Sequence, residues 1–173
     1  TTLRLPAIYG ARDKYRRLRS YLKRMDDGRQ VILLGKTIST WKFSRGYVDN
    51  VAHAIVLAVE NDLAAGKVFN VAEPNAMTEA EFVRAIGEAA GWQGEVRILP
   101  DAQLPKHLQQ PVNFEQNWDV DTHAIRDQLG YTEIVAVQKA IRRTIEWERA
   151  NPPEVEPFKI DYVQEDDAIA KNP

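Results

Sequence analysis

A cluster of basic side chains near the start of the chain is the clearest concentration of one chemistry. Its members are Arg12, Lys14, Arg16, Arg17, Arg19, Lys23 and Arg24, with Asp13 as the one acid among them. Residues 12, 16, 19 and 23 recur at helical intervals, so a helix would place them on one face. Such a face could bind an anion: a substrate phosphate, a cofactor phosphate or RNA. The alternative is a solvated helix face, which is the commoner meaning of a charge run.

Other catalytic patterns are missing from the sequence. The absence of cysteine excludes disulfides, thiolate nucleophiles and Cys-ligated metals. His53, His107 and His123 are far apart and lack a metal-binding spacing such as H-x-x-x-H, so we expect no metal site. The nucleophile elbow G-x-S-x-G does not occur either.

The composition is that of an ordinary soluble chain. Hydrophobic residues make up 44% and charged residues 28% of 173 residues, which argues against intrinsic disorder. The longest apolar runs, such as 31–34 and 54–59, fall far short of the ~20 residues that span a bilayer. The net charge of −2 gives no overall attraction to nucleic acid. We expect a cytoplasmic protein without membrane contact, since the lack of cysteine fits a reducing compartment.

Strands and helices alternate along the predicted chain. Strands are expected at 1–5, 30–34, 67–72 and 95–99, with 41–48 as a further strand or an extended loop. Helices are expected at 14–25, 52–60, 78–91, 121–130 and 134–149. Thr78 and Glu81 form a capping box pattern, and Asp49 or Asn50 is the expected cap of the helix at 52–60. This order predicts the α/β class.

Four stretches, taken together, resemble the NAD(P)-dependent epimerase/dehydratase family, the extended short-chain dehydrogenases. Residues 3–10 (LRLPAIYG) are similar to the family's Leu-Arg-x-x-x-x-Tyr-Gly strand and loop. Residues 45–52 (RGYVDNVA) and 68–72 (VFNVA) are similar to two later segments of that family. Residues 121–131 resemble its late Asp-(Ser/Thr) to Leu-Gly-(Tyr/Trp) helix. Each stretch alone is weak, but four in the family's order form a fairly specific signal.

The resemblance implies the C-terminal, substrate-binding part of a Rossmann-like extended short-chain dehydrogenase, with strands of an incomplete parallel sheet. The family's Gly-rich turn and Tyr-x-x-x-Lys pair do not occur in this sequence, so we expect the catalytic residues upstream of Thr1. Residues 1–150 would form the substrate-binding domain, and residues 151–173 an acidic tail, either docked or disordered.

The implied parent is an epimerase, dehydratase or reductase, hence an isomerase or oxidoreductase, that binds NAD or NADP. Its partners would be a small-molecule substrate, phosphorylated or nucleotide-linked, and the missing N-terminal dinucleotide-binding lobe. This chain alone would be inactive and would hold no cofactor.

The resemblance also implies roles for particular residues. Pro6 and Tyr9 lie on the loop that approaches the nicotinamide, although turn chemistry would explain them as well. Arg45 matches a substrate-phosphate arginine, the alternative being a salt bridge within the domain. Arg16 and Arg17 would also bind substrate.

Two departures from the pattern argue against a conventional nucleotide sugar. Arg17 stands where some nucleotide-sugar enzymes of the family carry Asn. Residues 108–118 contain no Arg or Lys, where such enzymes often place an Arg. Gln110, Asn113 and Trp118 could line a pocket there instead, and an ordinary surface loop is the alternative.

A competing hypothesis is a non-catalytic binding module that uses the basic helix 12–24 for RNA or other polyanions. Its signature would be an affinity that falls steeply with salt concentration. The remaining conspicuous residues have structural interpretations. We expect the Asn70 amide to satisfy backbone groups and the four tryptophans to lie in the core or at domain contacts.

Overall fold

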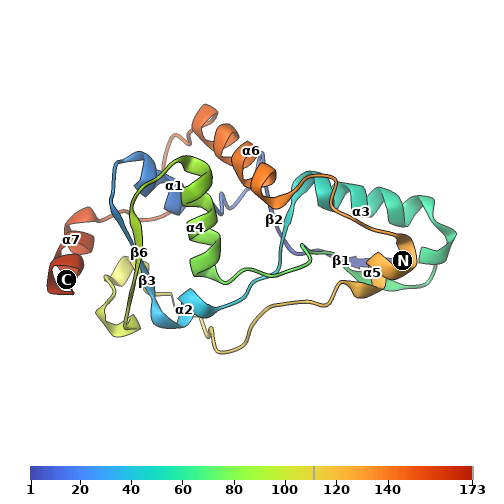
Figure 1. Ribbon diagram of the computed structural model, residues 1–173, viewed down its shortest axis with the longest axis horizontal. Helices are drawn as coiled ribbons and strands as arrows, with labels where there is room; N and C mark the ends of the chain where they lie inside the picture. Colours follow the sequence, from blue (N-terminus) through green and yellow to red (C-terminus); the bar gives the residue numbers. More distant parts are fainter. Residues whose placement is uncertain (111, 173) are drawn as a thin grey trace.

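The computed structural model describes residues 1–110 and 112–172, and it shows an elongated chain of short strands and longer helices (Figure 1). The strands are β1 (Thr2–Arg4), β2 (Ala7–Tyr9), β3 (Val31–Gly35), β4 (Arg45–Tyr47), β5 (Val68–Asn70) and β6 (Glu95–Leu99). The helices are α1 (Arg19–Asp26), α2 (Lys36–Thr40), α3 (Val48–Glu60), α4 (Glu79–Ala90), α5 (His123–Leu129), α6 (Val137–Ala150) and α7 (Tyr162–Lys171).

The described strands form three separate pairs, and every pair is parallel. β1 pairs with β5, β2 with β4, and β3 with β6. Parallel partners need a long crossover, and helices provide it here: the chain passes through α4 between β3 and β6. This arrangement confirms the predicted α/β fold with strands of an incomplete parallel sheet.

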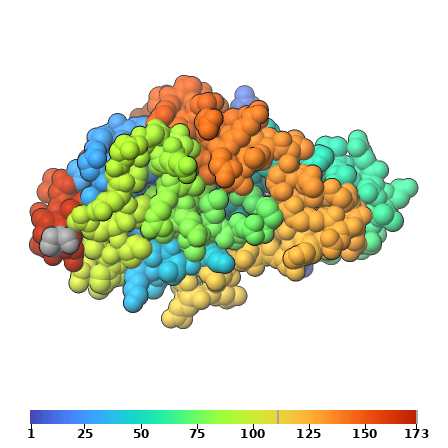
Figure 2. All heavy atoms as spheres, in the orientation of Figure 1, coloured from blue at the N-terminus to red at the C-terminus, as the bar shows by residue number. Residues whose placement is uncertain are grey.

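The described residues form two larger hydrophobic cores. The elements around them lie toward the two ends of the elongated chain (Figure 1). We call β3, β6, α1, α2, α4 and α7 the α7 end, and β1, β5, α3 and α5 the α3 end. Leu22, Phe82 and Ile86 belong to the core that α1 and α4 share, while Phe69 and Ile125 belong to the core of the α3 end. Helices α4 and α6 pack together and cover much of one face (Figure 2).

Helix α4 forms where the sequence predicts it because both of its ends carry strong local signals. The Thr78 hydroxyl accepts from the backbone N–H of Glu81, and the Glu81 carboxylate accepts from the backbone N–H of Thr78. Gly91 ends the helix in the left-handed conformation, at φ 75°, which glycine adopts without a steric penalty.

The predicted helix at 14–25 is wrong in its first half, since α1 begins at Arg19. The Asp13 carboxylate accepts from the backbone N–H groups of Tyr15 (3.0 Å) and Arg17 (2.9 Å), which stabilises a turn instead. Arg12 and Arg16 have φ values of 65° and 45°, outside the range of a right-handed helix. The basic residues 12–17 therefore do not share a helix face with Arg19 and Lys23.

Two further predictions need correction. The helix α3 starts at Val48, so neither Asp49 nor Asn50 is its cap; the buried Asn50 amide binds the backbone N–H and C=O of Val135. No regular element was expected after residue 151, yet residues 162–171 form α7, whose Ala168 packs in a small core with Leu33 and Leu104. Pro173, the last residue of the predicted tail, lies outside the described residues.

Candidate functional site

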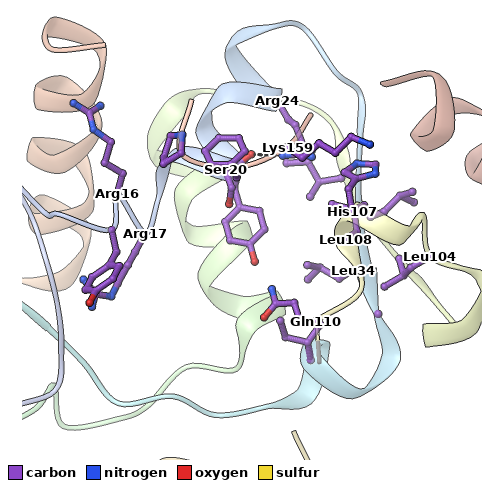
Figure 3. A pocket seen from close by; sticks show the side chains of 18 residues that line it. Arg16, Arg17, Ser20, Arg24, Leu34, Leu104, His107, Leu108, Gln110 and Lys159 are labelled. Carbon is purple, nitrogen blue, oxygen red and sulfur yellow. Dashed lines mark hydrogen bonds between the residues drawn. The ribbon is translucent and has the colours of Figure 1, made fainter. Parts of the chain in front are cut away.

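A cavity of about 290 Å³ opens at the α7 end, between α1, β3, residues 104–110 and residues 157–159. Leu34, Leu104 and Leu108 form an apolar side of this cavity, which we call the α1–β3 cavity (Figure 3). His107 and Lys159 lie at one end of it and Gln110 at the other (Figure 3). An apolar wall with polar groups at both ends is the usual character of a small-molecule site.

A shallower cavity of about 320 Å³ lies beside β2, and its lining includes Pro6, Tyr9 and Arg17. Arg17 lines both cavities, and Arg16 and Gln110 line the α1–β3 cavity. The structure therefore brings the predicted substrate residues Arg16, Arg17 and Gln110 together. Pro6 and Tyr9 lie beside the second cavity.

Arg45 lines neither cavity, because its charge is engaged inside the domain. Its buried guanidinium pairs with the carboxylate of Glu79 and donates to the C=O of Phe43 at 3.1 Å. It also lies 4.0 Å from the centre of the Phe82 ring, a favourable cation–π contact. This geometry matches the alternative given for Arg45, a salt bridge within the domain. A contact of Arg45 with a substrate phosphate stays a prediction.

The second oxygen of Glu79 links Arg45 to the α1–β3 cavity. It accepts a hydrogen bond from the hydroxyl of Tyr21 at 2.7 Å, and Tyr21 lines the cavity. Burial, next to the Glu79 carboxylate, raises the pKa of Tyr21 well above its ordinary value. Tyr21 therefore keeps its hydroxyl proton and acts as a hydrogen-bond donor at neutral pH.

Tyr9 is fully buried, and its side chain points into the core. Its hydroxyl donates to Glu73 at 2.8 Å, and its ring packs against Tyr47 and Phe82. Burial raises the pKa values of both Tyr9 and Glu73. Any contact of this loop with a nicotinamide would thus involve its backbone and Pro6 rather than the Tyr9 hydroxyl, and such a contact stays a prediction.

Five of the seven members of the basic cluster form ion pairs. Arg17 pairs with Asp13 and Lys23 with Asp27, while the other acids come from the last quarter of the chain. Those pairs are Arg16–Glu148 (2.7 Å), Arg19–Glu156 (2.6 Å) and Arg24–Glu165 (2.6 Å). A polyanion would have to compete with these carboxylates, and RNA binding by residues 12–24 stays a prediction.

Tyr21, His107, Phe158 and Lys159 line the α1–β3 cavity but were not among the predicted site residues. His107 is fixed by Glu165, whose carboxylate lies 2.9 Å from Nε2. Its Nδ1 is buried and has no hydrogen-bond partner in the described part of the chain. No local pattern marks these residues, because they meet only through contacts between distant segments.

The predicted pocket residues Asn113 and Trp118 differ from Gln110, because neither lines the α1–β3 cavity. The Asn113 side chain accepts from the backbone N–H of Glu115 at 2.8 Å, which is ordinary turn chemistry, and Asn113 lines neither of the two cavities. Trp118 is half-exposed and packs edge-on against Trp41, so it lies outside the core. It lines a further cavity beside Pro6, and its role at a domain contact stays a prediction. The Asn70 amide donates to the C=O of Asp121 at 2.9 Å, which confirms its predicted backbone role.

Two further features do not occur in the described part of the chain. None of the helices within residues 1–110 and 112–172 has the length and apolar character needed to cross a membrane. In the same residues, histidine, aspartate and glutamate nowhere gather in threes in a way that could hold a metal ion.

Comparison with known families supports the resemblance seen in the sequence. Residues 1–72 match the NAD dependent epimerase/dehydratase family. This match confirms the predicted resemblance for the segment that contains β1, β2, α1, β3, α2, β4, α3 and β5.

Solved structures with the same arrangement include two enzymes that act on nucleotide sugars. UDP-glucose 4-epimerase of Thermotoga maritima, with UDP-glucose, has a TM-score of 0.65 and 23% identity over 86% of this chain and 45% of its own. DesIV, a dTDP-glucose 4,6-dehydratase from Streptomyces venezuelae with NAD bound, has a TM-score of 0.64 and 19% identity over 91% and 46%. At this identity the likeness shows the fold.

A relative from Sinorhizobium fredii, the uncharacterized protein y4nL, is 24% identical over 168 residues, which is 84% of this chain and 46% of that protein. This chain therefore spans about half the length of the proteins it matches.

Proposed function

We propose that this chain is the substrate-binding part of an NAD(P)-dependent epimerase, dehydratase or reductase that acts on a sugar or nucleotide sugar. Cofactor binding and hydride transfer would belong to an N-terminal lobe of a longer parent. The family match over residues 1–72 and the parallel α/β fold support this proposal, as does the coverage of about half of each similar protein.

The α1–β3 cavity is the single observation that carries the substrate assignment. A nucleotide sugar has flat or apolar ring faces and an anionic phosphate bridge, so it needs an apolar wall beside a cationic end. Leu34, Leu104 and Leu108 offer the wall, and Lys159 offers a cation at the edge. Gln110 can donate and accept hydrogen bonds, which suits the polar edge of a base or the hydroxyls of a sugar.

The nicotinamide cofactor would supply the hydride acceptor when bound to the parent. The described residues of this chain do not fit its phosphates, because no Gly-rich turn opens a helix that could cradle them. The loop at residues 6–10 can contribute one wall through Pro6 and its backbone. The work of this chain would be to bind and orient the substrate and to exclude water from it.

Titration of the full chain 1–173 with UDP-glucose tests the cavity assignment. We expect the unmodified chain to release measurable heat on binding. The affinity of Gln110→Ala should be several-fold lower, because that change removes hydrogen bonds at the cavity edge. Gln138→Ala, an exposed position on α6, is the matched control and should bind as the unmodified chain does. Equal affinities in all three proteins would contradict the role of this cavity.

A second experiment addresses the parent enzyme. The longer protein should interconvert or dehydrate a nucleotide sugar in the presence of NAD or NADP, as followed by chromatography of the products. The chain 1–173 alone should produce none. Turnover by the chain alone would show that the catalytic groups lie within these residues and would overturn the division of labour proposed here.

A further inference from the structure

The segment after α6 returns to the α7 end and forms one side of the α1–β3 cavity. Pro157, Phe158 and Lys159 line the cavity, with Lys159 beside His107 (Figure 3). Phe158 is half-buried, whereas the Lys159 side chain keeps 67% of its surface exposed. A region expected from its sequence to be a tail thus contributes directly to the cavity.

Two ion pairs fix this segment on either side of the cavity-lining residues. Before them, Glu156 accepts from Nε (3.2 Å) and Nη2 (2.6 Å) of Arg19. After them, Glu165 accepts from Nε (3.1 Å) and Nη2 (2.6 Å) of Arg24. Both are two-point contacts between a planar guanidinium and a carboxylate, which fix orientation as well as distance.

The second of these pairs is fully enclosed. The side chains of Arg24 and Glu165 are 4% and 1% exposed, and His107, at 2%, covers the same carboxylate. Solvent and salt therefore screen this pair little. Residues 157–159 lie between Glu156 and Glu165, which are both held by ion pairs, and this restricts where their side chains lie at the cavity.

The charges around the cavity are mostly neutralised, and this singles out Lys159. Arg16, Arg17 and Arg24 each have a carboxylate within 2.7 Å. The carboxylate nearest to Lys159 among the described ion pairs belongs to Asp161, 3.6 Å away and on the same segment. A ligand anion that enters the cavity would displace a close partner from any of the three arginines but not from Lys159.

We propose that Lys159, held in place by the Arg19–Glu156 and Arg24–Glu165 pairs, binds the phosphate of the ligand in this cavity. The inference rests on the proposed function, since it takes the ligand to be a phosphorylated compound. Phe158 would pack against the ring of the same ligand. The C-terminal segment would then determine which phosphorylated substrates the cavity accepts.

Titration of the chain 1–173 with UDP, and separately with inorganic pyrophosphate, tests this proposal. A hydrogen bond to a charged group contributes enough that Lys159→Gln should weaken binding of both probes by roughly ten-fold or more. Lys171→Gln, an exposed position on α7, is the matched control and should leave both affinities unchanged. Lys159 is exposed, so the substitution should leave the thermal unfolding midpoint unchanged.

The outcomes separate this inference from the proposed function. If UDP binds equally to the unmodified chain and to Lys159→Gln, the role of Lys159 is overturned while nucleotide binding stands. If only pyrophosphate binds and Lys159→Gln abolishes it, the phosphate role stands and nucleotide recognition falls. If neither probe binds to the unmodified chain, both are contradicted.

A second variant tests the positioning of Lys159 by the ion pairs. Glu156→Gln removes the negative charge that pairs with Arg19 and leaves Lys159 unchanged. We expect faster hydrogen exchange at residues 157–161 together with a several-fold loss of pyrophosphate affinity. Faster exchange with an unchanged affinity would overturn the positioning role of the segment.

Discussion

The α7 end and the α3 end both have an apolar core, but their ion pairs differ in range. At the α7 end, arginines near the start of the chain pair with acids near its end, as in Arg19–Glu156 and Arg24–Glu165, which lie 137 and 141 residues apart. At the α3 end, Phe69 and Ile125 pack in an apolar core, and the ion pair Arg126–Glu133 joins residues seven positions apart. Long-range ion pairs thus add to the apolar core that α1 and α4 share at the α7 end, whereas the Arg126–Glu133 pair at the α3 end is local.

The surfaces of the two ends also differ. Helix α3 and the turn after it expose Ile55, Val56, Val59 and Leu63, with Val59 at 79% exposure. These four exposed apolar side chains fall within nine positions, whereas at the α7 end Ile98 and Val163 are exposed far apart in the sequence. The α7 end instead presents a cavity with charged residues at its edge. Under the proposed function, the cavity at the α7 end is where the substrate would bind.

The largest effect is expected from breaking the buried pair at the α7 end. Arg24→Ala would leave the Glu165 carboxylate buried without its partner, which costs about 3–5 kcal/mol of unfolding free energy. Urea unfolding measures the loss, and hydrogen exchange should place it first in α7. Replacing both residues by leucine should restore much of the stability. A loss below about 1 kcal/mol for Arg24→Ala would show that the pair is not the main attachment of α7.

The corresponding test at the α3 end removes an apolar side chain. Ile125 is fully buried, so Ile125→Ala should cost about 2–5 kcal/mol through lost burial and the cavity left behind. The loss should be the same at low and high salt, because no charge is involved. Increased hydrogen exchange confined to α3 and α5 is expected, and exchange that rises equally in α7 would contradict the separation of the two ends.

A smaller effect is expected at the N-terminal cap of α4. This helix carries Glu79, the partner of Arg45, and Phe82, which belongs to the core shared with α1. Thr78→Ala removes the side-chain acceptor for the Glu81 N–H and should cost about 1 kcal/mol. Thr78→Ser keeps the acceptor and should cost much less. Thermal or urea unfolding distinguishes the two variants, and equal losses would mean that the methyl group rather than the cap matters.

The smallest effect concerns Glu73, which lies between the two ends beside Tyr9 and Arg45. Burial raises the pKa of this carboxyl above its ordinary value of 4.5, while the Tyr9 hydrogen bond and the Arg45 charge partly oppose the shift. The folded chain therefore binds this proton more tightly than the unfolded chain. The resulting stability is complete below pH 4.5 and is lost as the pH rises through the folded pKa.

Glu73→Gln should remove this pH dependence, because the amide oxygen can still accept from Tyr9 and carries no charge. We expect the variant to be slightly more stable than the unmodified chain at pH 7 and equally stable at pH 3. Unfolding curves at both pH values provide the measurement. A variant that is less stable at pH 7 would show that the Glu73 charge is favourable in the folded state.

The predictions that succeeded were those set by neighbouring residues. Thr78, Glu81 and Gly91 specify both ends of α4 through hydrogen bonds that span at most a few positions. The short helix before Gly130 and the strand pattern at residues 95–99 are equally local and were predicted correctly. The family resemblance over the first part of the chain also came from short stretches in a fixed order.

The predictions that failed required information from elsewhere in the chain. Helical spacing at residues 12–23 predicted one basic helix face. Instead, Asp13 stabilises a turn, and Glu148 and Glu156 form ion pairs with Arg16 and Arg19. Residues 162–171 lack a strong apolar period, so their helix was not predicted. The helix is stabilised by tertiary contacts: Ala168 packs in a small apolar core, and Glu165 forms an ion pair with Arg24.

The α/β class, the helix ends with strong caps and the resemblance to the epimerase/dehydratase family can all be read from the sequence alone. These features can be predicted because local hydrogen bonds and the period of apolar residues depend on residues close together in the sequence. Which arginines are neutralised, and which residues line the α1–β3 cavity, became known from the folded chain. Those properties depend on pairs such as Arg24 and Glu165, whose approach follows from the packing of the whole chain.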